Sequence, residues 1–429
     1  MGLGRRQGQR SHGWPIFGVM PDQPAAPRRI LLADADAFFV AVARLVDPEG
    51  AGKAPLLIVG GAAGSRGVVC SASYETRKFG VRSAMPISRA LRLCPDAMCV
   101  PVPRRACSAK HREIREVLER FTPHVQGASI DEWYLDLAGT ERLYEGASLE
   151  TIAHRIRTSV VEATGMTVSI GGGTSKLVAK LAVERAKPKI GSGANGVHIV
   201  APGGELEFMR QLALADIPGI GPKTTARLAD AGLRSVKDVL ALDAAALARH
   251  VGERDAAWLA ERVRGVDEGE VADRDVAKSI SRDETFDTDL HDDVLLEGEL
   301  AELVGRAAAD LRSDELSART VTVRIRDTDF TTRQASRTVE QALSSDRALF
   351  AVARQLLAKL RRARRVPARL LGVALSNFTD PPAVQLALFE KASAPLETAR
   401  DRELSRAVDA VRARFGRDAI APGRKPRRQ

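Results

Sequence analysis

A ten-residue stretch with three acidic side chains constrains this chain more than any other segment. It reads Ala-Ser-Ile-Asp-Glu-Trp-Tyr-Leu-Asp-Leu over residues 128–137, and its ends alternate apolar and polar residues like a half-buried strand. Successive strand residues point to opposite faces, so Asp131 and Glu132 can share a ligand only at a turn or bulge. Acidic pairs are also common on solvated turns, so this segment alone leaves both interpretations open.

A second acidic cluster follows an apolar run near the N-terminus. Asp34 and Asp36 come directly after Ile-Leu-Leu at residues 30–32, and a helix-like run begins at residue 37. We interpret Asp36 mainly as the N-cap of that helix and Asp34 as a ligand. Asp34, Asp131 and Glu132, brought together from two strand ends, could hold two Mg²⁺ ions, which prefer hard oxygen ligands.

The pattern around these clusters predicts a layered α/β domain, because apolar strands alternate with helical periodicity. The glycines at residues 171–173 superficially suggest a phosphate loop. They lack the Gly-x-x-x-x-Gly-Lys-Ser/Thr spacing, and we reject that motif. Lys176 at a helix start can still meet a phosphate.

A strand beginning at residue 67 leads into a helix that Gly80 ends. Tyr74, Arg77 and Lys78 lie three and four residues apart on one face of this helix, which suits a triphosphate. A solvated basic face is the alternative for this pattern taken alone.

Composition limits the class of protein. The 429 residues are 44% hydrophobic, enough for two to four domains with proper cores. The net charge of +10 favours a polyanionic partner. The four cysteines show no metal-ligand spacing and are expected to be reduced, and no apolar run is long enough to span a bilayer. We expect a cytoplasmic protein.

The second half of the chain carries three further patterns. Ile-Pro-Gly-Ile-Gly-Pro-Lys at residues 217–223 predicts a helix-hairpin-helix in which Gly219, Gly221 and Lys223 meet duplex phosphates, with an ordinary helix connection as the alternative. A charged segment at residues 262–278 indicates a linker. Beyond it a small α+β domain is expected.

One strand of that domain alternates inward apolar residues with outward polar ones. The expected outward, DNA-facing arginines are Arg324, Arg326, Arg333 and Arg337. In the C-terminal tail, Gln385, Leu386, Leu388 and Phe389 form a candidate docking peptide, or else a final strand. Leu404, Val408, Val411 and Phe415 fall on one face of a later helix.

Together these motifs resemble the Y-family DNA polymerases of the bacterial DNA polymerase IV type, in the expected order over residues 28–389. The resemblance implies an α/β and α+β right-hand polymerase with palm, fingers, helix-hairpin-helix thumb and little finger. The implied boundaries are a disordered tail 1–27, palm 28–37 and 103–190, fingers 38–102, thumb 191–262, linker 263–278, little finger 279–379, and tail 380–429.

The same resemblance implies a function: low-fidelity, template-directed DNA synthesis across damaged templates. Asp34, Asp131 and Glu132 would bind two Mg²⁺ ions, with the Ala35 carbonyl completing one shell. The residues that would hold the deoxynucleoside triphosphate are Ser71, Tyr74, Arg77 and Lys176, with Phe39 as the gate against a ribose 2′-hydroxyl. The peptide at 385–389 would dock a monomeric enzyme on the sliding clamp while primer-template DNA is bound.

Four positions depart from the family pattern: Ala43, Cys107, Trp133 and Ser175. None removes a ligand, so they bear on efficiency more than on the reaction. A catalytically idle DNA-binding scaffold and a palm-fold nucleotidyl cyclase are the alternatives.

Overall fold

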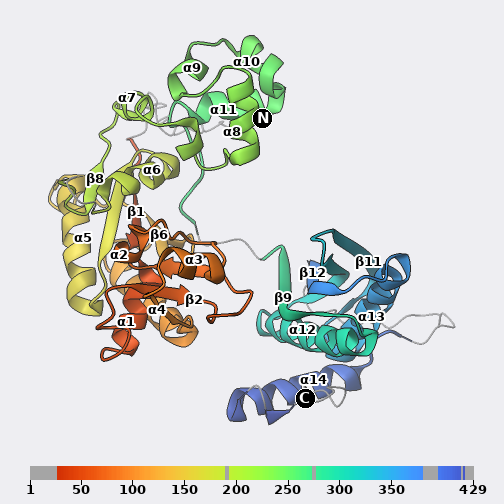
Figure 1. Ribbon diagram of the computed structural model, residues 1–429. Coiled ribbons are helices and arrows are strands. Elements are labelled where there is room, and N and C mark those ends of the chain that lie inside the picture. Colours follow the sequence, from red (N-terminus) through yellow and green to blue (C-terminus); the bar gives the residue numbers. More distant parts are fainter. Residues whose placement is uncertain (1–26, 189–192, 273–276, 380–394, 417–418, 421–429) are drawn as a thin grey trace, which may run out of the picture. The chain divides into compact units, whose positions relative to one another are not determined.

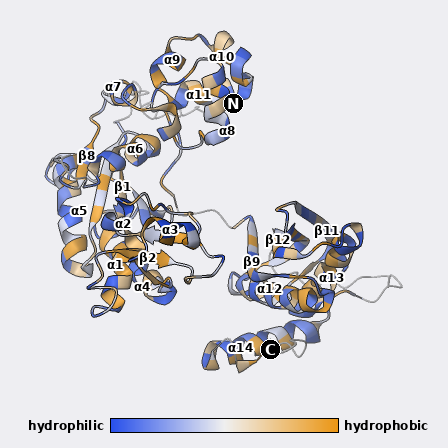
Figure 2. Ribbon diagram, in the orientation of Figure 1, coloured by the Kyte–Doolittle hydropathy of each residue, from blue (hydrophilic) through white to orange (hydrophobic). Residues whose placement is uncertain are grey.

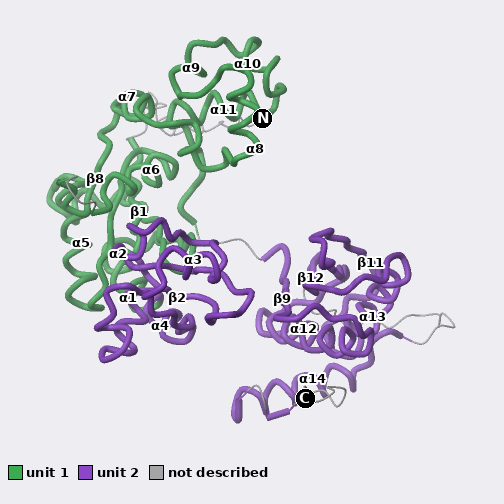
Figure 3. Tube along the Cα trace, in the orientation of Figure 1, with its two compact units in different colours: residues 1–36, 112–272 green, residues 37–111, 273–429 purple. Residues whose placement is uncertain are grey.

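The computed structural model describes residues 27–188, 193–272, 277–379, 395–416 and 419–420. The chain divides into two compact units, one of residues 1–36 and 112–272 and the other of residues 37–111 and 273–429 (Figure 3). Each unit combines segments that are distant in sequence.

The first unit is built on a five-stranded sheet in the order β5-β6-β1-β7-β8. Figure 1 labels β1, β6 and β8 of this sheet. β1 (Ile30–Ala35) is buried along its whole length and pairs antiparallel with both β6 (Glu132–Asp136) and β7 (Val168–Gly173). β5 (Val125–Gly127) and β8 (Val197–Ile199) form the edges. The expected half-buried strand is therefore β6, whose alternating burial places Trp133 and Leu135 in the core.

Helices α5 (Leu149–Thr164) and α6 (Lys176–Ala186) contact this sheet. The glycines of β7 explain how closely α6 approaches. A Cβ at Gly171 would lie 2.2 Å from the Val183 backbone nitrogen and 2.4 Å from the Ala179 carbonyl oxygen. Gly171 therefore permits close helix–strand packing, which agrees with the rejection of a phosphate loop.

A helical cluster completes the first unit. It consists of α7 (Glu205–Met209), a 3₁₀ turn (Leu214–Asp216), α8 (Pro222–Asp230), α9 (Val236–Leu240), α10 (Ala244–Val251) and α11 (Glu253–Arg262). Its apolar core is continuous with Leu177, Val178 and Leu181 of α6. The helical cluster thus rests on the same helix that covers the sheet.

The expected linker at residues 263–278 begins too early. Val271 is buried against Ile30 and Leu32 of β1, and Arg28 donates to the Gly269 carbonyl at 2.8 Å. The low apolar content of this segment indicated a linker, but its apolar residue Val271 is nevertheless buried.

The N-terminal part of the second unit has a three-stranded sheet, β3-β2-β4, of β2 (Leu57–Gly60), β3 (Val69–Ala72) and β4 (Met98–Val100). β2 is strongly hydrophobic (Figure 2). The accompanying helices are α1 (Phe38–Val46), α2 (Tyr74–Arg77) and α3 (Ile87–Leu93). The boundary between the two units falls within α4 (Arg104–Leu118).

The C-terminal part of the second unit is an antiparallel sheet in the order β11-β10-β12-β9. Its strands are β9 (Ser279–Leu290), β10 (Ser317–Asp327), β11 (Thr332–Leu343) and β12 (Ala368–Thr379). Helices α12 (Asp293–Ser313) and α13 (Asp346–Ala363) pack on one face, where Val321, Val323 and Ile325 enter the core. The predicted α+β domain is therefore present.

The final helix, α14 (Ala399–Phe415), is present as predicted, but its apolar residues are not its docking face. Leu404 is 62% exposed and Phe415 is 66% exposed, whereas Asp401 and Ser405 are buried. Asp409 accepts hydrogen bonds from Arg312 of α12 at 2.6 and 2.9 Å. Polar contacts dock this helix, and periodicity alone could not show that.

Candidate active site

Two acidic side chains face each other across neighbouring strands of the first unit. Asp34 of β1 is the direct cross-strand partner of Glu132 of β6, so both side chains lie on the same face of the sheet. Asp131 lies in the bend just before β6, and its carbonyl accepts a 2.9 Å hydrogen bond from the Ala35 N–H. The predicted turn at the acidic pair is confirmed.

Two lysines bind these carboxylates. Lys187 Nζ lies 2.9 Å from Asp34 Oδ2 and 2.6 Å from Glu184 Oε1, and Lys180 Nζ binds Glu132 Oε1. Sequence reasoning gave neither lysine a role. Lys187 is the C-cap that follows α6, so helical spacing gave no signal for its contact with Asp34.

Burial makes the Asp34 carboxyl hard to ionise. Loss of solvent raises its pKa to about 7, with the nearby Glu132 charge adding to the rise and Lys187 opposing it. Burial also pulls the pKa of Lys187 down, but Asp34 and Glu184 outweigh that effect and raise it. A positive charge beside Asp34 therefore favours its ionised form.

Asp131 does not join the other two carboxylates. Its side chain accepts a hydrogen bond from the Ser129 hydroxyl of its own turn. Within the described ranges, no three His, Cys, Asp or Glu side chains gather closely enough to hold a metal ion. The backbone of all three acids therefore lies in one region of the sheet, but only the side chains of Asp34 and Glu132 lie close together.

The interpretation of Asp36 as a helix cap is wrong. The N-cap of α1 is Ala37, which makes no side-chain cap, and Asp36 is buried and accepts a 2.8 Å hydrogen bond from Ser169 Oγ. Ser169 lies on β7, so sheet pairing rather than helix capping positions this carboxylate. That partner is distant in sequence and had no local signal.

Lys176 does not reach the carboxylate pair either. Its ammonium donates to Gln126 Oε1 at 2.5 Å and to the Glu270 carbonyl at 3.2 Å, and lies 4.8 Å from the Tyr134 ring centre. Tyr134 is two residues along β6 from Glu132. The role predicted for Lys176, contact with a triphosphate, stays a prediction.

The triphosphate residues expected in the second unit share one local site there. Tyr74 and Arg77 lie on the single turn of α2, with the guanidinium 5.1 Å from the tyrosine ring centre. Arg77 Nε donates to the Ala72 carbonyl at 3.0 Å, which fixes its direction, and Ser71 is buried on β3. Phe39 is half-buried on α1 and packs edge-on against Phe38.

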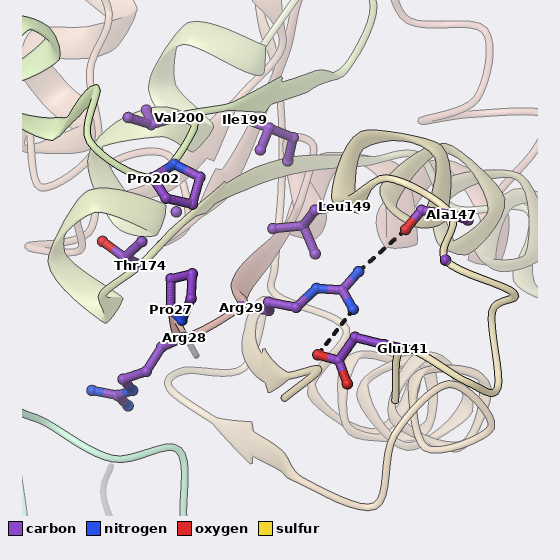
Figure 4. A pocket seen from close by; sticks show the side chains of 12 residues that line it. Pro27, Arg28, Arg29, Glu141, Ala147, Leu149, Thr174, Ile199, Val200 and Pro202 are labelled. Atoms are coloured by element: carbon purple, nitrogen blue, oxygen red, sulfur yellow. Dashed lines mark hydrogen bonds and ion pairs between the residues drawn. The ribbon is translucent and has the colours of Figure 1, made fainter. Parts of the chain in front are cut away.

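A cavity of about 370 Å³ lies elsewhere in the first unit (Figure 4). Arg29 lines it, donates to the Ala147 carbonyl at 3.3 Å and forms an ion pair with Glu141. Arg29 precedes β1, whereas Asp34 lies near the other end of that strand. None of the catalytic candidates lines the cavity, and its two arginines bind other groups, Arg28 the Gly269 carbonyl and Arg29 the Ala147 carbonyl and Glu141.

The hairpin at residues 217–223 leads into α8 through two glycines. Gly219 adopts φ 99°, and Gly221 caps α8 without a side-chain hydrogen bond, followed by Pro222 and the exposed Lys223. A Cβ at Gly219 would lie 2.7 Å from the Trp258 ring. The glycine is thus required by both its backbone angle and its neighbour.

The expected arginine face of the C-terminal sheet holds only in part. Arg324 and Arg326 alternate with buried residues and point outward, but Arg333 and Arg337 pair with Ile325 and Val321 and share the helix-covered face. Arg333 binds the fully buried Asp327, and Arg337 donates to Gln355 on α13 at 2.6 Å. Strand register, not sequence alternation, decides this.

Comparisons with known proteins bear on this geometry. The impB/mucB/samB family model matches residues 33–184, its C-terminal domain model matches 277–388, and a SAM-like helix-hairpin-helix tandem model matches 212–264. A DNA polymerase IV of Dehalococcoides mccartyi (strain CBDB1) is 36% identical over 92% of this chain and 97% of its own length. The chain belongs to the DNA polymerase IV group of the Y family.

Solved Y-family structures share the fold. A Y-family polymerase chimera, Dbh-Dpo4(243-245)-Dbh, is 26% identical over 82% of this chain and all of its own, with a TM-score of 0.73. An insertion ternary complex of Dbh DNA polymerase has the same identity and coverage, with a TM-score of 0.55. The protein is a DNA-directed DNA polymerase of the translesion class.

The departures from the polymerase pattern are accommodated structurally. Ala43, Cys107 and Trp133 are buried, and Ser175 caps α6 while donating to the Gly265 carbonyl at 2.8 Å.

The peptide at 385–389 lies outside the described residues. Among the described helices, none is long and apolar enough to cross a bilayer.

Proposed function

We propose that Asp34, Asp131 and Glu132, with the Ala35 carbonyl, hold two Mg²⁺ ions during DNA synthesis. The supporting observation is that two lysine ammonium groups lie against Asp34 and Glu132, where the buried acids demand positive charge. All the donors are hard oxygens, which suits this metal. Rotation of the Asp131 side chain away from Ser129 would complete the set.

When bound, the ions would lower the pKa of the primer 3′-hydroxyl and shield the leaving pyrophosphate. Lys187 and Lys180, released from their carboxylates, would turn to phosphate oxygens of the incoming nucleotide. Ser71, Tyr74 and Arg77 would hold the same triphosphate, with Arg77 oriented by the Ala72 carbonyl. Lys176, at the start of α6, would bind the same triphosphate, and Phe39 would exclude a ribose 2′-hydroxyl.

The DNA contacts would be to phosphates and not to base edges. Gly219, Gly221 and Lys223 present backbone N–H groups and one ammonium at the start of α8. Arg324 and Arg326 project from the outward face of the C-terminal sheet. These contacts suit an enzyme that follows any template, and we expect low fidelity.

We further propose that residues 385–389 dock the enzyme, as a cytoplasmic monomer, on the sliding clamp. The sequence Gln-Leu-Ala-Leu-Phe lies just beyond β12 and before α14. A second attachment would raise the local concentration of enzyme at the primer end. Free cysteines, two of them buried, agree with a reducing compartment.

The decisive experiment is extension of a primed DNA template with Mg²⁺ and four deoxynucleotides. Glu132→Gln should lower the rate about 10³-fold, the effect of losing roughly 4 kcal/mol of transition-state stabilisation. Asp136→Asn is the matched control, because Asp136 lies at the other end of β6 and its side chain accepts the Ala138 N–H at 2.9 Å. Equal rates for Glu132→Gln and wild type would refute the assignment.

A further inference from the structure

Four cross-strand rows on the outward face of the C-terminal sheet contain a single acidic residue. The strand registers place four cross-strand rows of four outward residues on it. These residues are Ser279, Ser376, Thr320 and Thr338; Ser281, Ala374, Thr322 and Ser336; Asp283, Gly372, Arg324 and Gln334; and Thr285, Leu370, Arg326 and Thr332. Asp283 is the one acid among them.

Asp283 does not point away from the sheet. It starts on β9 and lies across β12 toward β10, so that its carboxylate is 3.7 Å from the Arg324 guanidinium. The crossing depends on Gly372, because a Cβ there would lie 1.7 Å from Asp283 Oδ1. Three neighbouring strands therefore combine to bring one carboxylate to one arginine.

The surroundings offer this carboxylate little else. On the same face, the Thr320 hydroxyl forms a 2.8 Å hydrogen bond with that of Thr338, and the Thr322 hydroxyl forms one of the same length with that of Ser336. Arg326 donates to the Thr332 hydroxyl at 2.8 Å. Of the two arginines in these rows, Arg324 forms an ion pair with an acid and Arg326 bonds to a hydroxyl.

We propose that Asp283 limits the affinity of this face for DNA by competing with a template phosphate for Arg324. The inference rests on the proposed DNA contact of the sheet. The pair is exposed, at 44% for Arg324 and 37% for Asp283, so its attraction is weak and a phosphodiester can replace the carboxylate. A face restrained in this way releases each phosphate readily, which suits an enzyme that must advance after every addition.

The test is primer-template binding by the full chain, measured by fluorescence anisotropy from 50 to 300 mM salt. Asp283→Asn should lower the dissociation constant about fivefold at 100 mM salt and steepen the slope of log K against log salt by about 0.9, one additional phosphate. Unchanged or weaker binding by Asp283→Asn would overturn the inference.

A neighbouring residue gives a matched control. Glu284 carries the same charge on the same strand, points to the other face, and forms an equally exposed ion pair with Arg306 at 3.6 Å. Glu284→Gln should leave affinity and slope unchanged. Equal gains from both substitutions would show a general charge effect and overturn the specific pairing.

Arg324→Gln separates this inference from the contact on which it rests. It should weaken binding, and in its background Asp283→Asn should give no further gain. Weaker binding by Arg324→Gln, without a gain in Asp283→Asn, would overturn the inference alone. No effect of Arg324→Gln would overturn the proposed DNA contact as well.

Discussion

The two sheets that carry charge in this polymerase use it in opposite ways. On the catalytic sheet, Asp34 and Glu132 are largely buried and each binds a lysine. On the outward face of the C-terminal sheet, Arg324 and Asp283 are both substantially exposed and form a longer ion pair. One arrangement is built around acids and the other around bases.

The difference follows from solvent. Charges interact strongly where water is excluded and weakly where it screens them, so a buried acid must have a cation while an exposed arginine does not need an acid. Loss of one cation should therefore have a large effect at the catalytic carboxylates. A single substitution on the DNA-facing surface should change the affinity for DNA only slightly. Substitutions in the two regions should differ accordingly.

Lys187→Met should give the largest effect among the variants that test this contrast. It removes the cation against Asp34, and we expect kcat/KM for an incoming nucleotide to fall about 100-fold, or roughly 2.7 kcal/mol. Lys53→Met should cost less than about threefold, because the exposed Lys53 pairs with Glu49 away from the carboxylates. Single-nucleotide incorporation kinetics measure both, and equal losses would contradict a specific role for Lys187.

Arg333→Gln breaks a buried ion pair within the otherwise exposed-charge region. It leaves the fully buried Asp327 with Arg364 as its remaining arginine, so the free energy of unfolding should fall by about 2 kcal/mol. Arg324→Gln, on the opposite face, should change it by less than about 0.5 kcal/mol. Urea unfolding distinguishes them, and equal losses would mean that burial is not the deciding factor.

Asp34→Asn should stabilise the metal-free enzyme by about 1 to 2 kcal/mol at pH 8. The folded-state pKa is raised from 3.8 to about 7, so wild type loses stability as pH rises through that interval, because the folded carboxyl must then ionise. The gain should shrink toward pH 5. Thermal unfolding with a chelator at several pH values measures it; a gain that is independent of pH would contradict the assigned cause.

Leu404→Ser should have the smallest effect. Leu404 is 62% exposed on α14, so the free energy of unfolding should change by less than about 0.5 kcal/mol. Asp409→Asn, by contrast, weakens the contact with Arg312 and should cost about 1 kcal/mol. A large loss from Leu404→Ser would show that the apolar face of α14 is covered in solution.

Much of the site could be predicted from local sequence. The two-residue period of a strand means that Asp131 and Glu132 could share a ligand only at a bend, and Asp131 does lie in one just before β6. Tyr74 and Arg77 share a face because they lie three residues apart on a helical turn. The helix-hairpin-helix glycines likewise require a particular backbone. These features depend on neighbours in the chain.

The missed features depend on partners far away. Lys187 finds Asp34 only because α6 packs against β1 and β7, and Asp36 finds Ser169 only through β1–β7 pairing. Val271 is buried because the segment after α11 returns to β1. No local pattern marks these contacts.

The sequence by itself determined the strand-borne acids, the helical basic residues and the polymerase family. Only the tertiary structure decided which charges meet. Arg333 shows the physical reason: its strand alternates regularly, but the turn at residues 328–331 sets the register that pairs it with Ile325 and turns it toward the helices. Periodicity relates residues within one element, whereas register and packing relate elements to each other.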